Sequence, residues 1–232
     1  MRLKLMTFNV QHFYNQITKD INYDAVAKEI IESQADIVGL NEVYGMDSIY
    51  GDQVKKIAMA SGMKYMYFAK AIDAPNGAYG NGIISKYPIK SIEKIMIPDP
   101  IKKENPNGYY ETRCIIKARL ESKITVMISH FGLNPDEHRR AVYTVVSNLE
   151  NEKCILMGDF NMRPDNDILM PINTKMHDAS MGYCNGEFTF SSIEPFEKID
   201  YIFVSKDIIV NKSFISTNIV SDHFYHFAEI EV

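Results

Sequence analysis

Several apolar runs in the sequence end in polar residues of the kinds that act in acid–base and metal chemistry. In CILMGDFN, Asp159 and Asn161 follow such a run and lie two positions apart. Side chains alternate along a strand, so both would point to one side while Phe160 turns back to the core. This delivers a carboxylate and an amide to one spot at a sheet edge. A turn, in which Asp and Asn are both common, is the alternative for this stretch alone.

Three further segments show the same feature. IVGLNEV places Glu42 after an apolar run, LMTFNV places Asn9 inside one, and VMISHF places His130 at the end of another. Buried polar groups are normally hydrogen-bonded, so a satisfied structural group explains each residue taken singly. The segments must therefore be weighed together.

The segment KIDYIFV is more specific. Asp200 lies among apolar residues in a predicted strand that is buried on both faces. A carboxylate there costs several kcal/mol unless it is paired or hydrogen-bonded, so it needs a partner. His223, in VSDHF, is the candidate. An Asp–His pair fixes the imidazole tautomer and raises its pKa, which suits a histidine that faces an anion.

Strands must hold these residues, and the sequence predicts many. The chain contains no internal repeat, low-complexity segment or Ser/Gly linker, so residues 1–232 are predicted to form one domain. Enrichment in β-branched and aromatic residues between turn residues indicates the strands. They are predicted at Leu3–Val10, Asp36–Val43, Tyr65–Ala69, Gly82–Ser85, Ile89–Ile97, Cys114–Leu120, Ile124–Phe131, Cys154–Gly158, Lys198–Val204, Ile208–Ile215 and Phe224–Val232.

Helices are fewer. They are predicted at Tyr23–Ser33, Asp52–Ala60 and Pro135–Glu150, the first with Asn22 as its cap. So many strands between few helices imply two packed sheets covered on the outside by helices. The irregular segment Asp99–Thr112 is predicted to be a long loop at the rim of a site.

Composition restricts the partners and the cellular compartment that the protein is expected to have. A net charge of -5 and a pI near 5.7 argue against a protein whose whole surface binds nucleic acid or an anionic membrane. No apolar run approaches transmembrane length, and a charge interrupts the apolar N-terminal stretch, unlike a signal peptide. Cys114, Cys154 and Cys184 form no C-x-x-C pair. A cytoplasmic protein without a disulfide framework is therefore expected.

Taken in order, the motifs resemble those of a known family. TFNV, LNEV, GNGIISKYPI, Arg113, SHFGL, GDFN, KIDYIFVS and SDH follow one another from Thr7 to His223. This series resembles the signature of the endonuclease/exonuclease/phosphatase superfamily, the DNase I-like metal-dependent phosphoesterases. The resemblance implies an α+β fold, a four-layer αββα sandwich of two mostly antiparallel sheets flanked by helices. It also implies hydrolysis of phosphoester bonds with Mg²⁺ or Mn²⁺.

The resemblance implies a metal site. Glu42 matches the family's main metal ligand, Asn9 a residue beside the metal, and Asp222 a further acidic residue near it. Members related to AP endonucleases often carry an acid two positions after the first Asn, whereas this chain has Gln11. That difference weakens the case for a second metal and for cleavage at abasic sites.

The resemblance also implies catalytic roles. Asp159 matches the acid that orients or deprotonates the attacking water, and Asn161 a donor to the phosphate. His223, held by Asp200, matches the histidine that contacts the scissile phosphate. His130 stands where many members have a second histidine.

Two further residues are weaker matches. Arg113 falls where a family arginine can reach the phosphate, and Asn81 is placed near the metal as scaffolding or as a second phosphate contact. The remaining histidines lack a motif context and are expected at the surface or in packing. They are His12, His138, His177 and His226.

The residues themselves are consistent with the chemistry that the resemblance implies. Carboxylate and amide oxygens suit Mg²⁺ or Mn²⁺ and not zinc, for which the sequence offers no His/Cys cluster. The leading interpretation is a divalent-metal-dependent phosphodiesterase or phosphatase. Its substrate is a phosphorylated small molecule, a lipid headgroup or a nucleic acid, with no membrane insertion and no evident protein partner. The alternatives are a DNA or RNA nuclease of the same superfamily and a non-catalytic binding module that retains the fold.

Overall fold

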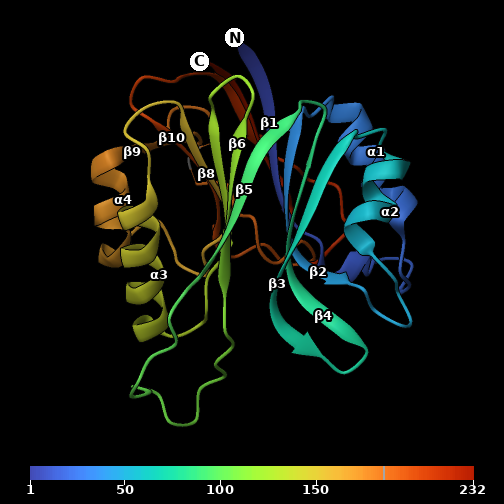
Figure 1. Cartoon of the computed structure of the whole chain (residues 1–232), viewed down its shortest axis with the longest axis horizontal. Coiled ribbons are helices and arrows are strands. Elements are labelled where there is room, and N and C mark those ends of the chain that lie inside the picture. The colour runs from blue at the N-terminus through green and yellow to red at the C-terminus, as the bar shows by residue number, and fades with distance from the viewer. Residues whose placement is uncertain (185) are drawn as a thin grey trace.

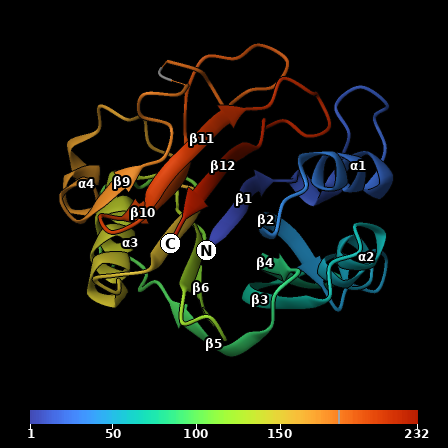
Figure 2. The ribbon, with the colours of Figure 1, turned by 90° about the horizontal axis from the view of Figure 1, so that it is seen from above.

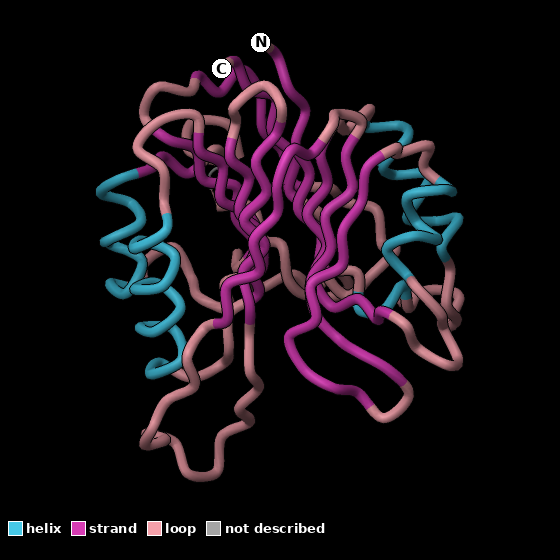
Figure 3. Tube along the Cα trace, in the orientation of Figure 1, coloured by secondary structure: helices cyan, strands magenta, loops and turns pink. Residues whose placement is uncertain are grey.

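Two six-stranded sheets pack face to face in the computed structural model, which describes residues 1–184 and 186–232. Helices α1 and α2 lie outside one sheet, and α3 and α4 lie outside the other (Figure 1). The helices are therefore the outer layers and the strands the inner ones (Figure 3). The expected four-layer αββα sandwich is confirmed.

The first sheet contains both chain ends. Its strand order is β11-β12-β1-β2-β4-β3, and β1 pairs in parallel with β2 while its other pairs are antiparallel. Strands β1 and β12 lie side by side near its centre (Figure 2). The strands are β1 (Arg2–Asn9), β2 (Ile37–Gly45), β3 (Tyr65–Ala74), β4 (Gly77–Ser85), β11 (Ile209–Ile215) and β12 (His226–Glu231).

The second sheet is built in the same way. Its order is β5-β6-β7-β8-β10-β9, and the parallel pair is β7 with β8. Helix α3 connects those two strands, as a parallel crossover requires. The strands are β5 (Ile89–Met96), β6 (Cys114–Leu120), β7 (Thr125–His130), β8 (Cys154–Asp159), β9 (Met176–Asp178) and β10 (Asp200–Ser205).

The helices begin at the residues that the sequence favours. Helices α1 (Tyr23–Ser33) and α2 (Gln53–Ala60) follow the caps Asn22 and Asp52, whose side chains accept backbone N–H groups. The other two helices are α3 (Pro135–Asn148) and α4 (Met170–Lys175). Short 3-10 turns span Gln11–Phe13 and Asp167–Leu169. None of the helices in the described part of the chain is long and apolar enough to cross a membrane.

Apolar side chains fill three interfaces. Between the sheets lie residues such as Leu5, Ile128 and Met157, all buried. Phe8 packs beneath α1 and α2, and Phe131 packs beneath α3. Because the strands at the centre of both sheets are covered on both faces, they read as nearly continuous apolar runs. A polar group that ends such a run lies at the edge of the sandwich.

Two local features differ from the predicted elements. Strands β3 and β4 extend beyond the predicted ends into a long hairpin, in which Gly80 allows the two strands to approach closely. A Cβ on Gly80 would lie 2.0 Å from the carbonyl oxygen of Ala69. Helix α4 and strand β9 were not predicted, since both are short and Pro171 interrupts the sequence pattern.

Candidate active site

Strands of both sheets bring the predicted site residues to one edge of the sandwich. Asp159 ends β8, and its register neighbours are His130, which ends β7, and Asp200, which begins β10. In the other sheet, Asn9 ends β1 and Glu42 lies in β2. Since parallel strands deliver their carboxyl ends to the same edge, this convergence follows from the topology.

A hollow of about 470 Å³ opens at this edge. Seven of the predicted site residues line it, while Asn9, Asp200 and Asn81 are buried behind it. The predicted residues that line it are Glu42, Arg113, His130, Asp159, Asn161, Asp222 and His223. The other lining residues are Tyr79, Tyr109, Glu111, Leu133, Phe190, Glu197 and Ile199. Tyr109 and Glu111 belong to the predicted rim loop, which is a loop in the structure.

Asn9 joins the two sheets through its side chain. Its amide nitrogen donates to Glu42 Oε1 at 3.1 Å and to Asp159 Oδ2 at 3.0 Å. Its carbonyl oxygen accepts the backbone N–H of Gln11 at 3.2 Å. The amide therefore presents N–H groups, not its oxygen, to the two carboxylates. It keeps two acids close together at a fixed separation.

Glu42 owes its position to an irregular strand. The register of β2 against β4 shifts between Leu40 and Val43, and Glu42 has a φ of 60°. A left-handed residue inside a strand is costly for a side chain with a Cβ, and a bulge re-aims the residues within it. Here the bulge turns the Glu42 carboxylate into the hollow.

Asn41 is a site residue that the sequence interpretation missed. Its Oδ1 accepts the backbone N–H of Asp159 at 3.0 Å, across the interface between the sheets. Its Nδ2 donates to Asn81 Oδ1 at 2.9 Å and to the carbonyl of Ser129 at 3.1 Å. Asn41 thus fixes the backbone of Asp159 at the edge that carries the hollow. Its position beside Glu42 in LNEV was the available signal.

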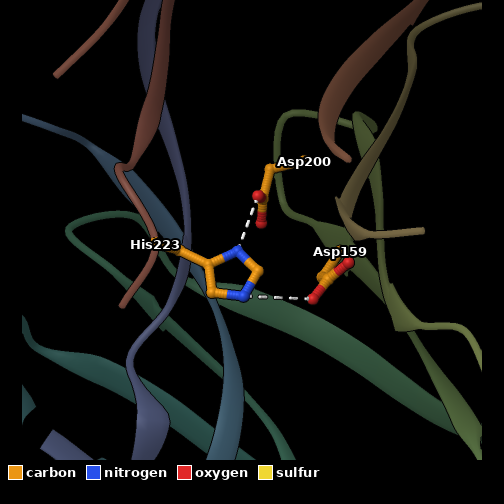
Figure 4. A group of neighbouring side chains, drawn as sticks. All are labelled: Asp159, Asp200 and His223. Carbon is orange, nitrogen blue, oxygen red and sulfur yellow. Dashed lines mark hydrogen bonds and ion pairs between the residues drawn. The ribbon is translucent and has the colours of Figure 1, made fainter. Parts of the chain in front are cut away.

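Asp200, His223 and Asp159 form a buried chain of charges (Figure 4). His223 Nδ1 lies 2.8 Å from Asp200 Oδ2, and its Nε2 lies 3.7 Å from Asp159 Oδ2. Burial alone would lower the pKa of His223, but the Asp200 and Asp159 carboxylates raise it to about 10. His223 is therefore an imidazolium at neutral pH. The predicted Asp200–His223 contact is present.

Asp159 is the most strongly perturbed acid of the hollow. Burial, followed by repulsion from Asp200, raises the pKa of Asp159 to about 7, although His223 and Asn9 act in the opposite direction. A carboxylate that takes up a proton near neutral pH is well matched to general-base work. Its other oxygen, Oδ1, accepts the backbone N–H of Asn161 at 2.9 Å, which holds the carboxylate in place.

His130 lies on the opposite side of Asp159 from Asp200. Its Nε2 is 3.6 Å from Asp159 Oδ2, and its Nδ1 is 3.1 Å from Arg113 Nη1. Burial, the Arg113 cation and His223 together hold the pKa of His130 well below its usual range. The two site histidines therefore differ in charge, because the Asp200 carboxylate keeps His223 protonated, whereas burial and the Arg113 guanidinium keep His130 neutral.

Asn161 adopts the left-handed conformation, with a φ of 50°. Its Nδ2 donates to the carbonyl of Phe131 at 3.0 Å and lies 3.2 Å from His130 Nε2. Asparagine tolerates this backbone conformation better than most residues. The turn after β8 returns the Asn161 amide to the same hollow as Asp159, so the two residues share one space as expected, but through a turn and not through strand alternation.

Oxygen ligands suited to a divalent cation line the hollow. The carboxylates of Glu42 and Asp222 both face it, and Asp222 uses Oδ1 to accept from Ser221 at 3.1 Å. This hard donor set fits Mg²⁺ or Mn²⁺. A second set comprises Asp159, Asp200 and His223, whose ligand atoms lie within 4.8 Å of one another. Its imidazole nitrogen already hydrogen-bonds Asp200, so the pair Glu42 and Asp222 fits a hard cation better.

The weaker predicted contacts are engaged elsewhere. Asn81 is buried, and its Nδ2 donates to the carbonyl of Cys114 at 2.9 Å. Its place is therefore the scaffold between the sheets, while contact with phosphate stays a prediction. Arg113 lines the hollow, but its guanidinium contacts Glu111 Oε1 at 2.5 Å as well as His130.

His12 lies closer to the site than expected. Its ring stacks on Tyr44 at 4.3 Å, and it packs edge-on against Tyr79, which lines the hollow. Burial lowers the pKa of His12, and the nearby Glu42 raises it in part. The left-handed turn at Gln11–Phe13 brings the ring here. Its position three residues after Asn9 was the signal in the sequence.

Two packed mixed sheets of six strands each, flanked by helices, match the DNase I-like fold. The chain matches the model of the endonuclease/exonuclease/phosphatase family over residues 6–223, and it belongs to that family. The members of this family are hydrolases that act on phosphoesters. The resemblance inferred from the motifs is confirmed.

Individual relatives are distant. The uncharacterized protein YbhP of Escherichia coli K12 is 25% identical over 171 residues, which cover 68% of this chain and 66% of that protein, just under two thirds. An endonuclease/exonuclease/phosphatase from Beutenbergia cavernae has a similar structure, with a TM-score of 0.82 and 18% identity over 100% of this chain and 72% of that one. The mannosyl-6-phosphatase Bt3783 of Bacteroides thetaiotaomicron has a TM-score of 0.78 and 16% identity over 99% and 100%. These two structures support the fold.

Proposed function

We propose that the protein is a hydrolase of phosphoester bonds that uses Mg²⁺ or Mn²⁺. The observation that carries this proposal is the convergence of Glu42, Asp159 and His223, from separate segments of the chain, on one hollow. A carboxylate for a cation, a base for water and a charged donor for phosphate are together in that space. The completeness of the set argues against a non-catalytic module that retains only the fold.

Asp159 activates the attacking water. Its raised pKa, about 7, makes it a base strong enough to accept a proton while it is still largely ionised near neutral pH. Asn9 and the backbone N–H of Asn161 hold its two oxygens, so the carboxylate needs little reorganisation. Positioned general bases typically contribute about 10²–10⁴-fold to a rate.

His223, His130 and Asn161 donate hydrogen bonds to the phosphoryl oxygens. His223 supplies a positive charge, because Asp200 keeps it protonated. Such donors are most effective when they already point to the place where negative charge develops. Attack proceeds in line, without a covalent intermediate, since no Ser or Cys pairs with a base in the described part of the hollow.

A divalent cation completes the site. Glu42 and Asp222 would hold it, with Asn9 beside them orienting the Glu42 carboxylate. When bound, it would neutralise phosphate charge and stabilise the leaving oxygen. The lining of the hollow is rich in acids, so a bound cation would also reduce the repulsion between these acids and an anionic phosphate.

A small substrate with one reacting phosphate fits better than a long nucleic acid. Arg113 is the one Arg or Lys among the described residues that line the hollow, and it is ion-paired with Glu111. Nucleic-acid sites instead track the backbone with several cations. The structural neighbour Bt3783 is a mannosyl-6-phosphatase, which is consistent with a small phosphomonoester as substrate.

We place the protein in a reducing, cytoplasmic compartment. Cys114, Cys154 and Cys184 are all free and buried. Burial raises the pKa of the Cys114 and Cys154 thiols to about 11, which keeps them unreactive.

The test is a substrate panel with Mg²⁺ and Mn²⁺. It comprises p-nitrophenyl phosphate, bis-(p-nitrophenyl) phosphate, sugar phosphates, inositol phosphates, a phospholipid, RNA, and single- and double-stranded DNA. We expect turnover of small phosphoesters that is lost in EDTA and restored by either metal. Preferred cleavage of DNA or RNA would support a nuclease instead. Turnover that is undiminished in EDTA would refute the metal dependence.

A further inference from the structure

Arg113 is a buried cation whose Nη1 atom has two close partners. Its side chain is 9% exposed, and Nη1 contacts Glu111 Oε1 at 2.5 Å and His130 Nδ1 at 3.1 Å. A guanidinium carries only donors and stays protonated in proteins. Arg113 immediately precedes β6 (Cys114–Leu120), whereas His130 ends the neighbouring β7. Two adjacent strands of one sheet thus fix their separation.

This contact determines where His130 carries its proton. Because Arg113 can only donate, His130 Nδ1 must offer its lone pair. A neutral imidazole has one N–H, so the proton lies on Nε2. We propose that Arg113 is a positioning residue that holds His130 as the neutral Nε2–H tautomer, so that this N–H serves as a donor to the phosphoryl group.

A competing contact is resolved by the same reasoning. Asn161 Nδ2 lies 3.2 Å from His130 Nε2, and a hydrogen bond from that amide would require a bare Nε2. The amide has an alternative acceptor, the carbonyl of Phe131 at 3.0 Å. Arg113 has no uncharged form to adopt, so its requirement prevails. The N–H groups of His130 and Asn161 then both face the hollow, where an oxygen atom could accept from both.

Glu111 offsets the free-energy cost of burying the Arg113 guanidinium. An uncompensated charge is costly in the interior, and the Glu111 carboxylate at 2.5 Å supplies the counter-charge. Burial and the charges of Arg113 and His223 disfavour a second proton on His130. The site therefore holds two unlike donors, an imidazolium fixed by Asp200 and a neutral imidazole fixed by Arg113.

The direct test is the tautomer of His130 in the intact protein. Long-range ¹H–¹⁵N correlation spectra of ¹⁵N-histidine-labelled protein distinguish a bare ring nitrogen from a protonated one, and the His130→Gln variant identifies the signals. We expect a bare Nδ1 and a protonated Nε2. A protonated Nδ1 in the wild-type protein would overturn the proposal.

Variants test whether Arg113 is the cause. Arg113→Met should give a mixture of tautomers, and Arg113→Lys, which keeps a cationic donor, should restore the wild-type pattern at least in part. If Arg113→Met fails to fold because Glu111 loses its partner, the double variant Arg113→Met/Glu111→Gln removes both charges. A tautomer that is unchanged in the folded Met variant would overturn the role of Arg113.

The role of Arg113 in turnover rests on the phosphoesterase function proposed above, whereas the tautomer of His130 does not depend on that function. On the best substrate of the panel, Arg113→Met should lower kcat by about 10²-fold, the usual effect of losing one aligned donor. Arg113→Lys should restore about half of the lost transition-state stabilisation, so its kcat should be roughly tenfold higher than that of Arg113→Met. A protein without any turnover but with the expected spectrum would refute the function and leave the tautomer assignment intact.

Discussion

The Oδ1 atom of Asn41, in the first sheet, accepts the backbone N–H of Asp159, in the second sheet, at 3.0 Å. This bond crosses the interface of the sandwich at the edge where Glu42 and Asp159 line the hollow. Asn41 is fully buried, and all of its side-chain hydrogen-bonding groups have partners in the protein. The position of Asp159 is therefore set by a residue of the opposite sheet.

The first prediction concerns this contact. Asn41→Ala should lower the free energy of unfolding by about 2–4 kcal/mol, because it leaves several buried groups without partners. It should also reduce kcat, since the Asp159 backbone loses its anchor. Urea unfolding and turnover measure the two effects. Asn173→Ala, at an exposed position of α4, is the control and should change stability by less than about 0.5 kcal/mol. Equal stabilities of the two variants would contradict the anchoring role.

The second prediction concerns the charge on His223. In Asp200→Asn the imidazole loses the carboxylate that chiefly raises its pKa. Wild-type activity should persist up to about pH 10, where His223 gives up its proton, and should fall at higher pH. In the variant this fall should move to lower pH, and kcat at neutral pH should drop by about 10²-fold. The measurement is kcat against pH at saturating metal.

Asp165→Asn is the matched control, because that acid lies exposed in the loop after β8. Its pH profile should coincide with that of the wild-type protein. An Asp200→Asn profile that also coincides with the wild type would show that the pair does not govern activity.

The third prediction concerns the cation. Mg²⁺ at a hundredfold excess over its Kd should stabilise the folded protein by about 2.7 kcal/mol, since ligands that bind only the folded state do so by mass action. This corresponds to a rise in Tm of roughly 5–10 °C for a chain of this size. Glu42→Gln should abolish most of the rise, whereas the exposed Glu152→Gln should retain it. Equal shifts in the two variants would exclude Glu42 as a ligand.

The fourth prediction concerns stability in acid. His226 is buried and resists protonation, because burial and the Lys198 cation lower its pKa to about 3. Its Nε2–H donates to Ser213 Oγ at 2.8 Å, and that hydroxyl donates to the carbonyl of Phe227. In the unfolded chain the pKa returns to about 6.5, so protonation there favours unfolding as the pH falls.

The contribution of His226 is therefore complete above pH 6.5 and is lost progressively toward pH 3. At pH 4.5 the loss should be about 2–3 kcal/mol. In His226→Asn the unfolding free energy should fall less steeply between pH 7 and pH 4.5. His177→Asn, at an exposed histidine, should follow the wild-type slope. Parallel slopes for all three proteins would contradict this role of His226.

The sequence predicted most of the fold because its strands are either covered on both faces or bounded by clear turns. The segment KIDYIFV predicted a buried carboxylate in need of a partner, and the structure supplies His223. The cost of burying an unpaired Asp200 predicted that it has a partner, and the histidine of VSDHF was the candidate. The spacing in GDFN predicted that Asp159 and Asn161 share one space, which they do, but a left-handed turn at Asn161 brings them together and not the alternation of a strand.

What the sequence did not reveal depends on contacts between distant segments. Asn41 is one residue before Glu42, yet its partner Asp159 lies on the other sheet. Arg113 was expected to reach the phosphate, but its contacts with Glu111 and His130 depend on the pairing of β6 with β7. His12 reaches the site through three successive left-handed residues, Gln11–Phe13, which no side-chain pattern indicates.

We propose that Asp159 activates water for attack on a phosphoester, and the Asp159→Asn variant is the decisive test of this role. The substitution keeps the size of the side chain and removes the base. With saturating Mg²⁺ or Mn²⁺, kcat on the best phosphoester substrate should fall by about 10²–10⁴-fold, while Asp165→Asn keeps wild-type turnover. Near wild-type turnover in a folded Asp159→Asn protein would contradict the account.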